Sequence, residues 1–298
     1  MKVRLGGVWI PLFVLLVTVC ALVGMNLSKT RAEDTTPSPE FIAAAMRDQE
    51  KPGMAVQITY DLQTSHVDKK TQQEVALAFE RRYIRTLDFI TTDERRTTNS
   101  PLVAFKSERI RTSFNRNTGE YREMTENYAG PWGRIEHTAN NAPDFPAFGS
   151  LNMESVVWHF GSEPLYGIVQ SGTVSGKEEV DGCDCWKIVK CYGKDNVQQR
   201  VICVDPKIGF CPRRMDLVIH GDVVHRIVLR DYKEVAPGVW FPTEQLGGTK
   251  LGDTPLTLTS YKVKDVKYYA SPAAKELPVK FPSKTRVHLD DGSEMKVP

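Results

Sequence analysis

Hydrophobic and polar residues alternate along most of the chain after residue 54. In the first such run Val56, Ile58, Tyr60 and Leu62 are separated by polar neighbours. A period of two places every second side chain on the same face of a strand, so this run predicts a half-buried β-strand. Similar runs predict further strands over Val75 to Phe89, Val103 to Phe114 and Tyr121 to Tyr128.

The alternation is clearer in the second half of the chain, where Gly, Pro and Asp turns separate the predicted strands. These strands cover Ile168 to Val174, Cys185 to Tyr192, Gln199 to Val204, Phe210 to Ile219, Val223 to Val235, Val239 to Leu246 and Leu256 to Tyr269. Short turns between successive strands are typical of an antiparallel meander. The pattern therefore predicts a mainly β (α+β) fold built on an antiparallel sheet.

One helix is predicted before the strands, from Ser38 to Glu50. Ser38 suits the N-cap position and Pro39 suits the first helical position. The apolar face of this helix consists of Phe41, Ile42, Ala45 and Met46. An amphipathic helix needs an apolar surface to lie against, so we expect this one to pack on the sheet.

Residues 131–164 interrupt the alternation with Pro131, Pro143, Pro146 and several glycines. We interpret this segment as an irregular insertion between two halves of the sheet, with a short helix over Leu151 to Phe160. Long irregular segments in compact domains commonly serve as lids or binding loops. No linker-like stretch interrupts the strands, so residues 38–298 are predicted to form a single β domain.

The first 32 residues have the layout of an export signal. Lys2 and Arg4 precede an uncharged apolar run from Leu5 to Met25, and no acidic residue occurs before Glu33. The run is longer than the core of a typical cleavable signal and approaches the length of a membrane helix, so a signal peptide and an uncleaved signal anchor both remain open. Either one, followed by a tether at residues 33–37, places the protein in the periplasm or cell envelope, with membrane association if the segment is uncleaved.

The charge of the chain argues against nucleic-acid binding. Residues 1–32 contain four basic residues and no acidic one, so their removal takes the formal net charge from +2 to −2. A nearly neutral protein lacks the basic surface that phosphate backbones require. We therefore predict no nucleic-acid partner.

Three groups of residues carry a resemblance to a known family: Asp205-Pro206-Lys207-Ile208-Gly209-Phe210-Cys211-Pro212-Arg213, Gly238-Val239-Trp240-Phe241-Pro242, and Phe281-Pro282 with Asp290-Asp291-Gly292. With them the chain resembles the outer-membrane lipoprotein-sorting family, which is similar to the lipoprotein carrier and receptor of the bacterial envelope. The resemblance covers roughly residues 38 to 298 in layout. Its segments are turn and strand signatures, which report fold more than activity.

The resemblance implies a curved antiparallel sheet that forms an incomplete barrel, covered by one or two helices, of which Ser38 to Glu50 is one. It also implies a lipid or a lipidated protein as the partner. The chain is longer than the carrier type, and the early Arg-bearing strand motif of the carrier has no match in it. No lipid-contacting residue is therefore carried over by position.

Four aromatic residues are the predicted ligand-binding residues: Trp158, Trp186, Trp240 and Phe241. Aromatic side chains supply large apolar areas in cavities that hold lipid or hydrophobic peptide. Ordinary core packing explains the same residues, and both interpretations remain open.

Five cysteines fall within one short stretch: Cys183, Cys185, Cys191, Cys203 and Cys211. An oxidising compartment makes disulfides the first expectation. If residues 205–209 form a hairpin loop, Cys203 faces Cys211 and the two can form a bridge, with Cys185 as the rival partner for Cys203. Free buried thiols are the alternative, and the spacing does not match that of structural zinc sites, so no metal is predicted.

The histidines show no ligand spacing, and no Gly-x-Ser-x-Gly elbow is present, so neither an enzyme nor a cofactor is predicted. We predict a non-enzymatic cell-envelope protein that binds an apolar ligand, a lipid or a lipidated protein, in the concave face of a half-barrel. Two alternatives remain: a protein-interaction or sensor module on the same fold, and an envelope hydrolase whose catalytic residues the sequence does not pair.

Overall fold

The computed structural model of the protein describes residues 2–5, 8–11, 36–50, 54–67, 74–86, 89–97, 107–115, 117–127, 130–137, 159–160, 163–193, 195–251, 254–269 and 277–298. They belong to two compact units, Met1–Ser38 and Pro39–Pro298. In the first unit β1 (Lys2–Leu5) and β2 (Val8–Pro11) pair antiparallel. Within the described ranges no helix is both long enough and apolar enough to span a membrane. Residues 12–35, with most of the predicted signal, lie outside the described part, so the signal stays a prediction.

The second unit is built mainly from strands. Its elements are α2 (Pro39–Gln49), β3 (Ala55–Val67), β4 (Glu74–Arg85), β5 (Phe89–Arg96), β6 (Ser107–Asn115), β7 (Glu120–Asn127), β8 (Trp132–His137), β9 (His159–Phe160), β10 (Glu163–Pro164), α4 (Leu165–Gln170), β11 (Thr173–Val180), β12 (Cys183–Tyr192), β13 (Gln198–Asp205), the 3-10 helix η1 (Pro206–Ile208), β14 (Cys211–Ile219), β15 (Asp222–Ala236), β16 (Val239–Leu251), β17 (Thr254–Tyr269), β18 (Arg286–Leu289) and β19 (Glu294–Lys296).

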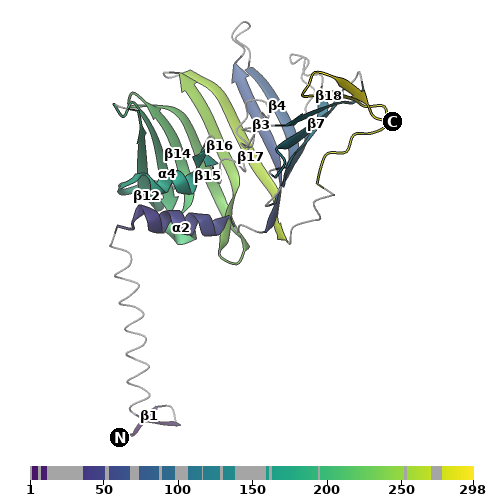
Figure 1. Ribbon diagram of the computed structural model, residues 1–298. Helices are drawn as coiled ribbons and strands as arrows, with labels where there is room; N and C mark the ends of the chain where they lie inside the picture. The colour runs from purple at the N-terminus through teal and green to yellow at the C-terminus, as the bar shows by residue number, and fades with distance from the viewer. Residues whose placement is uncertain are drawn as a thin grey trace. The chain divides into compact units, whose positions relative to one another are not determined.

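One sheet contains most of these strands. Its order among the described residues is β11-β12-β13-β14-β15-β16-β17-β3-β4-β5-β6-β7-β8-β18-β19, with β11 and β19 at its two edges (Figure 1). Neighbouring strands are antiparallel except β8 and β18, which are parallel. The sheet is curved and open, which confirms the predicted mainly β fold with an incomplete barrel.

The two halves of the sheet meet where β17 pairs with β3. The pairing runs from Thr257 opposite His66 to Tyr269 opposite Ala55, with a bulge between Val263 and Asp265. This contact joins segments that are far apart in the sequence. It makes the inward-facing side chains of both halves parts of one face.

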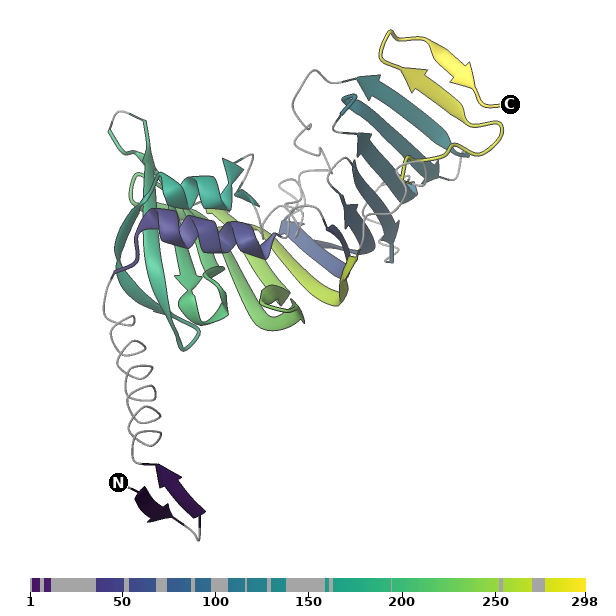
Figure 2. The same ribbon diagram turned by 60° about the horizontal axis from the view of Figure 1, so that its bottom comes forward.

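Two helices pack on the β11–β16 half of the sheet (Figure 2). The structure confirms the predicted first helix as α2, which buries Ile42, Ala43 and Met46 against the strands. Phe41, which the sequence placed on the apolar face, is 60% exposed instead. The second helix, α4, includes Ile168, where the sequence predicted a strand. That prediction was wrong because Leu165, Ile168 and Val169 are buried together at helical spacing.

The segment predicted as an irregular insertion contains regular structure in its described part. β8 continues the sheet beyond β7, and β9 pairs with β10 in a short hairpin before α4. Residues 138–158 lie outside the described part, as does most of the helix predicted over Leu151 to Phe160. The insertion as a binding loop therefore stays a prediction.

The C-terminal segment packs on β6–β8 and completes the core there. The backbone N–H of Val279 donates to Ser113 Oγ at 2.9 Å, and Val287 is fully buried. Gly133 of β8 lies against Phe281, and a Cβ at position 133 would come within 2.5 Å of the Phe281 ring. Glycine at this position therefore allows the C-terminal segment to approach the sheet closely.

Candidate functional site

One face of the sheet carries α2 and α4, and we call it the inner face. Leu229 of β15 packs beneath these helices. It lies opposite Gln245 of β16, which lies opposite Tyr261 of β17, which in turn lies opposite Leu62 of β3. Directly opposed residues on neighbouring strands point to the same face, so this row carries the inner face from the helices to the central strands.

The part of the inner face beneath the helices is apolar, and we call it the helix-covered cluster. Both helices and the strands β12–β15 contribute to it. Its buried members are Ile42, Ala43, Met46, Phe160, Leu165, Ile168, Val169, Trp186, Ile188, Ile202, Val204, Met215, Ile227 and Leu229. Removal of this apolar surface from water holds the helices on the sheet.

A second apolar cluster, the central cluster, lies on the strands that join the two halves. Its buried members are Val56, Ile58, Tyr60, Leu62, Tyr83, Ile90, Phe241 and Tyr261. Tyr261 and Leu62 belong to the row that begins at Leu229. The inner face is therefore one surface with two apolar regions.

The C-terminal end of α2 is fastened to β16 and β4 by polar contacts. Gln49 Oε1 accepts a hydrogen bond from the backbone N–H of Trp240 at 2.9 Å, and Gln49 Nε2 donates to the carbonyl of Gly238 at 3.0 Å. The next residue, Glu50, forms an ion pair with Arg85 at 3.5 Å. These contacts fix where α2 ends relative to the sheet.

A buried arginine with a carboxylate partner lies beside the central cluster. Arg81 of β4 is 3% exposed and donates from Nε to Glu94 Oε2 at 2.7 Å, and its Nη1 donates to the hydroxyl of Tyr60 at 3.3 Å. Arg81 lies opposite Tyr60, so the pair is on the inner face. A buried charge is tolerated only when it is paired and hydrogen-bonded, and Glu94 and Tyr60 provide those partners.

Gln245 brings a polar group into the middle of the inner face. Gln245 is 1% exposed, and its Oε1 has no hydrogen-bond partner among the described residues. A buried carbonyl oxygen without a donor is unfavourable by about 1 to 3 kcal/mol. This atom is thus available to a hydrogen-bond donor that reaches the inner face.

A second polar group borders the helix-covered cluster. Glu163 of β10 accepts hydrogen bonds from Lys190, from the hydroxyl of Tyr192 at 2.6 Å and from Arg200 at 2.8 Å. Burial disfavours the charged form of Glu163, but the hydrogen bonds from Lys190 and Tyr192 and the charge of Arg200 outweigh it. The net effect lowers the pKa of Glu163 below its ordinary value.

The structure separates the residues that the sequence proposed as a ligand site. Trp186 belongs to the helix-covered cluster and Phe241 to the central cluster. Trp240 is only partly buried and is adjacent to Phe241 in β16, so its side chain leaves the strand on the opposite face. Trp158 lies outside the described residues. As ligand-binding residues all four stay predictions.

The predicted opposition of Cys203 and Cys211 is wrong. Cys203 lies opposite Arg214, and Cys211 lies opposite Asp205, with a register shift between Cys203 and Val204. Cys203 packs with Cys185, whereas the thiol of Cys211 contacts Gln49 Oε1 at 3.8 Å.

The five cysteines of the described part are free: Cys183, Cys185, Cys191, Cys203 and Cys211. Burial raises the pKa of Cys185 and of Cys211 to about 12, and that of Cys203 to about 11. The three buried thiols therefore stay protonated at neutral pH. Within the described part of the chain no three His, Cys, Asp or Glu side chains are placed to hold a metal ion.

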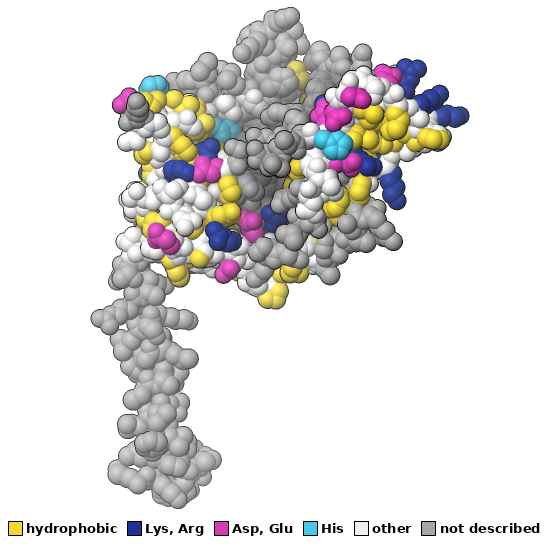
Figure 3. Space-filling model, in the orientation of Figure 1, with side chains coloured by type: hydrophobic (Ala, Val, Ile, Leu, Met, Phe, Trp, Pro, Cys, Tyr) yellow, Lys and Arg dark blue, Asp and Glu magenta, His cyan; other side chains and the backbone are white. Residues whose placement is uncertain are grey.

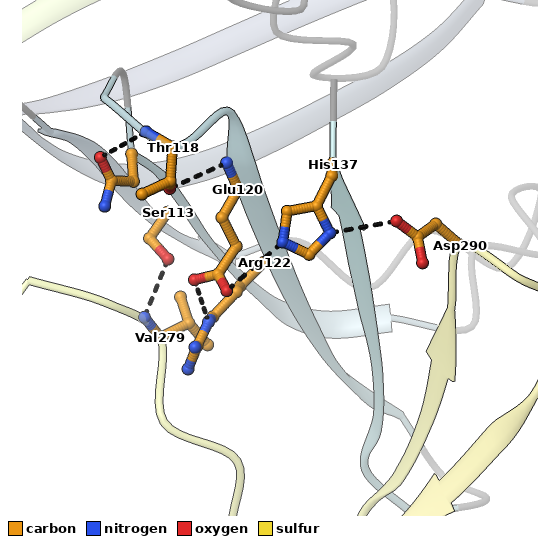
Figure 4. Close-up of polar contacts among 8 residues, drawn as sticks. Ser113, Thr118, Glu120, Arg122, His137, Val279 and Asp290 are labelled. Carbon is orange, nitrogen blue, oxygen red and sulfur yellow. Dashed lines mark hydrogen bonds and ion pairs between the residues drawn. The ribbon is translucent and has the colours of Figure 1, made fainter. Parts of the chain in front are cut away.

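His137 has two carboxylate neighbours at the other end of the sheet. Figure 4 shows His137 of β8 between Glu120 of β7 and Asp290, which follows β18. His137 Nε2 lies 3.8 Å from Glu120 Oε2, and His137 Nδ1 lies 3.0 Å from Asp290 Oδ2. The hydroxyl of Ser113 instead accepts from Val279. The two carboxylates connect His137 to β7 and to the C-terminal strands.

The described surface carries mixed charge. Figure 3 shows acidic, basic and hydrophobic side chains interspersed, with Lys and Arg side chains gathered near β18. The hydrophobic residues exposed on β16 and β17 are Leu246 and Leu258, which alternate with inner-face residues and so lie on the outer face.

The polar residues of the inner face were not predicted from the sequence. One signal for them was present in β4, where Leu77, Phe79, Arg81 and Tyr83 share one phase of the alternation. An arginine among three large apolar residues of the same phase predicts a buried charge with a partner.

Comparisons with known proteins give the fold. No family model matches the chain, and no curated protein sequence matches it. A DUF1329 family protein from Desulfovibrio piger has a TM-score of 0.50 at 13% identity, over 80% of this chain and 97% of that protein. A putative outer membrane lipoprotein-sorting protein domain from Vibrio parahaemolyticus has a TM-score of 0.50 at 12% identity, over 79% of this chain and 94% of that domain. The resemblance predicted from the sequence is therefore confirmed, and the chain has the fold of the outer-membrane lipoprotein-sorting proteins.

Proposed function

We propose that the protein is a non-enzymatic protein of the cell envelope that binds an apolar ligand, the acyl chain of a lipid or of a lipidated protein, on the inner face of its sheet. The observation that carries the proposal is the continuity of the two apolar clusters on that face, through the row Leu229, Gln245, Tyr261 and Leu62. Apolar side chains gathered on one face suit a hydrocarbon chain.

The energetics support capture without covalent chemistry. Each methylene buried against an apolar surface contributes about 0.8 kcal/mol. A chain of ordinary length therefore gains enough free energy from the clusters alone, even after the cost of its own ordering. Gln245 Oε1 offers a hydrogen-bond acceptor to a hydroxyl or amide near the chain.

In this proposal the acyl chain enters between the helices and the strands. α2 and α4 contact each other and share the helix-covered cluster with the strands. We propose that α2 shifts on the strands when a chain enters; its contacts with the sheet side include those of Gln49 and Glu50 and the ring contact of Phe41 with Phe210. The likeness to a lipoprotein-sorting domain supports the choice of ligand class. The predicted export signal directs the protein to the cell envelope, where such ligands occur.

The test is extraction of the ligand. Full-length protein purified from its native envelope is extracted with organic solvent, and the extract is analysed by mass spectrometry. We expect lipid in stoichiometric amount, and repeated empty extracts from folded protein contradict the proposal.

A matched pair of variants locates the ligand. Leu229→Ala, on the inner face, is expected to lower the lipid yield, whereas Leu258→Ala, on the outer face, leaves it unchanged. Circular dichroism confirms that both variants are folded.

A further inference from the structure

Two cations face each other on the inner face without an intervening acid of the sheet. Lys190 of β12 lies directly opposite Arg200 of β13. Each is two residues from a buried member of the helix-covered cluster, Ile188 and Ile202 respectively, so both point to the inner face. Like charges directly opposite each other destabilise a sheet, and these two side chains are only 18% and 16% exposed. The arrangement therefore needs an anion between the two cations.

The row of these cations continues to a histidine. Arg200 lies opposite Leu217, which lies opposite His225, which lies opposite Thr249. His225 Nδ1 is 2.9 Å from Thr249 Oγ1, while Nε2 is buried and has no hydrogen-bond partner among the described residues. The row thus contains a ring nitrogen that lacks a partner in the same region as the two cations.

An aromatic ring joins the histidine to the cations. The Phe160 ring of β9 lies 5.3 Å from the Arg200 guanidinium and 6.5 Å from the His225 ring. Phe160 also belongs to the helix-covered cluster. The polar row therefore borders the apolar surface directly, as a site for a molecule with a charged head and an apolar tail requires.

The anion present between the cations comes from outside the sheet. Glu163 is carried by the two-residue strand β10, and among the described residues it is the one carboxylate that contacts Lys190 or Arg200. One carboxylate balances two cations only in part. Its two oxygens receive donors from Lys190, Tyr192 and Arg200, the pattern by which proteins bind phosphate and carboxylate groups.

We propose that the row of Lys190, Arg200 and His225 binds the anionic head group of the apolar ligand, and that Glu163 occupies the place of this head group when no ligand is bound. The inference rests on the proposed function and adds the ligand class: an amphiphile with a phosphate or carboxylate next to its acyl chains. The planar guanidinium of Arg200 suits two oxygens of such a group.

Isothermal titration calorimetry of the full chain tests the inference with three probes. Dihexanoyl phosphatidic acid carries the anion, dihexanoylglycerol has the same chains without it, and inorganic phosphate is the anion alone. We expect the anionic lipid to bind about tenfold more tightly than dihexanoylglycerol, the usual size of a charge-assisted hydrogen bond. Competition by inorganic phosphate then indicates that the phosphate group itself is recognised, whereas preference without competition indicates recognition of the lipid head group.

Three variants separate the head-group site from a structural role. Arg200→Gln is expected to abolish the preference and leave the affinity for dihexanoylglycerol unchanged. Glu163→Gln is expected to increase the affinity for the anionic lipid, because it removes the internal competitor; a mere tether predicts the opposite sign. Arg109→Gln, whose partner Asp93 lies on the outer face at 2.6 Å, is the matched control and is expected to change neither affinity.

The outcomes distinguish the two proposals. Equal binding of the anionic lipid and dihexanoylglycerol by the unaltered protein overturns the head-group site and leaves the proposed function standing. Absence of binding by either lipid overturns both. Weaker binding of the anionic lipid by folded Glu163→Gln also overturns the site.

Discussion

The side chain of Gln49 pairs with the backbone of β16 around Trp240 in the manner of a neighbouring strand. Its Oε1 accepts from the N–H of Trp240 at 2.9 Å, and its Nε2 donates to the carbonyl of Gly238 at 3.0 Å. One side chain at the end of α2 thus serves two backbone groups at the start of β16. The position of α2 over the inner face depends on this contact.

Replacement of Gln49 by Ala is expected to loosen α2. The loss of one partly buried and one exposed hydrogen bond to the backbone lowers the free energy of unfolding by about 1 to 2 kcal/mol. Amide hydrogen exchange in residues 39–49 should accelerate more than in β12–β15. Gln57→Ala is the control, because its amide contacts the exposed Arg82 and its loss changes stability by about 0.5 kcal/mol or less. Unchanged exchange in α2 contradicts this account.

Replacement of Arg81 by Met is expected to be strongly destabilising. It leaves the largely buried Glu94 carboxylate, which is 12% exposed, without its guanidinium partner, and the cost is expected at the lower end of the range for a buried pair, about 3 kcal/mol. Arg109→Met breaks a pair whose members are each 34% exposed and should cost less than about 1 kcal/mol. Urea unfolding measures both. Equal costs for the two variants would show that Arg81 is not buried as described.

The stability of the protein should fall on acidification in a range set by His225. Burial lowers the pKa of His225 below its ordinary value of 6.5, so between these two values the unfolded chain binds more protons than the folded one. The stabilising effect of neutral His225 is complete above pH 6.5 and is lost as the pH falls toward the lowered value. His225→Gln should flatten the stability curve in this range, and an unchanged curve is the contrary result.

Glu163 acts over a lower range of pH. Its pKa is lowered from the ordinary value of 4.5, so its contribution to stability is present above pH 4.5 and is lost as the pH falls through the lowered value. The free energy of unfolding, measured by denaturant titration at a series of pH values, should therefore depend on pH differently in Glu163→Gln and in the unaltered protein only below pH 4.5. A difference in this pH dependence that is confined to neutral pH contradicts a lowered pKa of Glu163.

The cysteines should react with alkylating agents in the order of their exposure. Cys191 is exposed and Cys183 partly buried, whereas burial keeps Cys185, Cys203 and Cys211 protonated. Brief iodoacetamide treatment of native protein at neutral pH, followed by mass spectrometry, should label Cys191 first and the three buried thiols only after unfolding. A peptide cross-linked through Cys203 and Cys211 would contradict the register of β13 and β14.

The alternation of the sequence predicted most strands and the first helix, because both are set by local periodicity. The pattern Val56, Ile58, Tyr60 and Leu62 corresponds to buried residues of β3, and Ser38 to Glu50 corresponds to α2. The pairing of β17 with β3 was not predictable in the same way. It joins a strand near the start of the second unit to one late in it, and no local signal identifies a partner at such a long sequence separation.

Backbone conformation explains the error at the cysteines. The turn between β13 and β14 contains η1, and both Gly209 and Phe210 have left-handed backbone, with φ of 69° and 59°. Phe210 therefore belongs to the turn, so Cys211 pairs with Asp205 and not with Cys203. An extra residue in β14 then moves the partner of Cys203 one position further, to Arg214. A left-handed phenylalanine is uncommon and is not expected from sequence.

The polar row of the inner face was also beyond prediction. Lys190, Arg200 and His225 are adjacent only through the register of four strands, and each looks like an ordinary surface residue in its own segment. The hairpin that delivers Glu163 has strands of two residues each, which leave no alternating pattern.

Photo-crosslinking with a fatty acid that carries a diazirine at the end of its chain tests the central claim most directly. After irradiation of the full chain, digestion and mass spectrometry locate the adducts. We predict adducts on inner-face residues such as Trp186, Leu229 and Leu62. Adducts mainly on Leu246 and Leu258, the exposed hydrophobic residues of the outer face, or no adducts at all, would contradict an acyl-binding inner face.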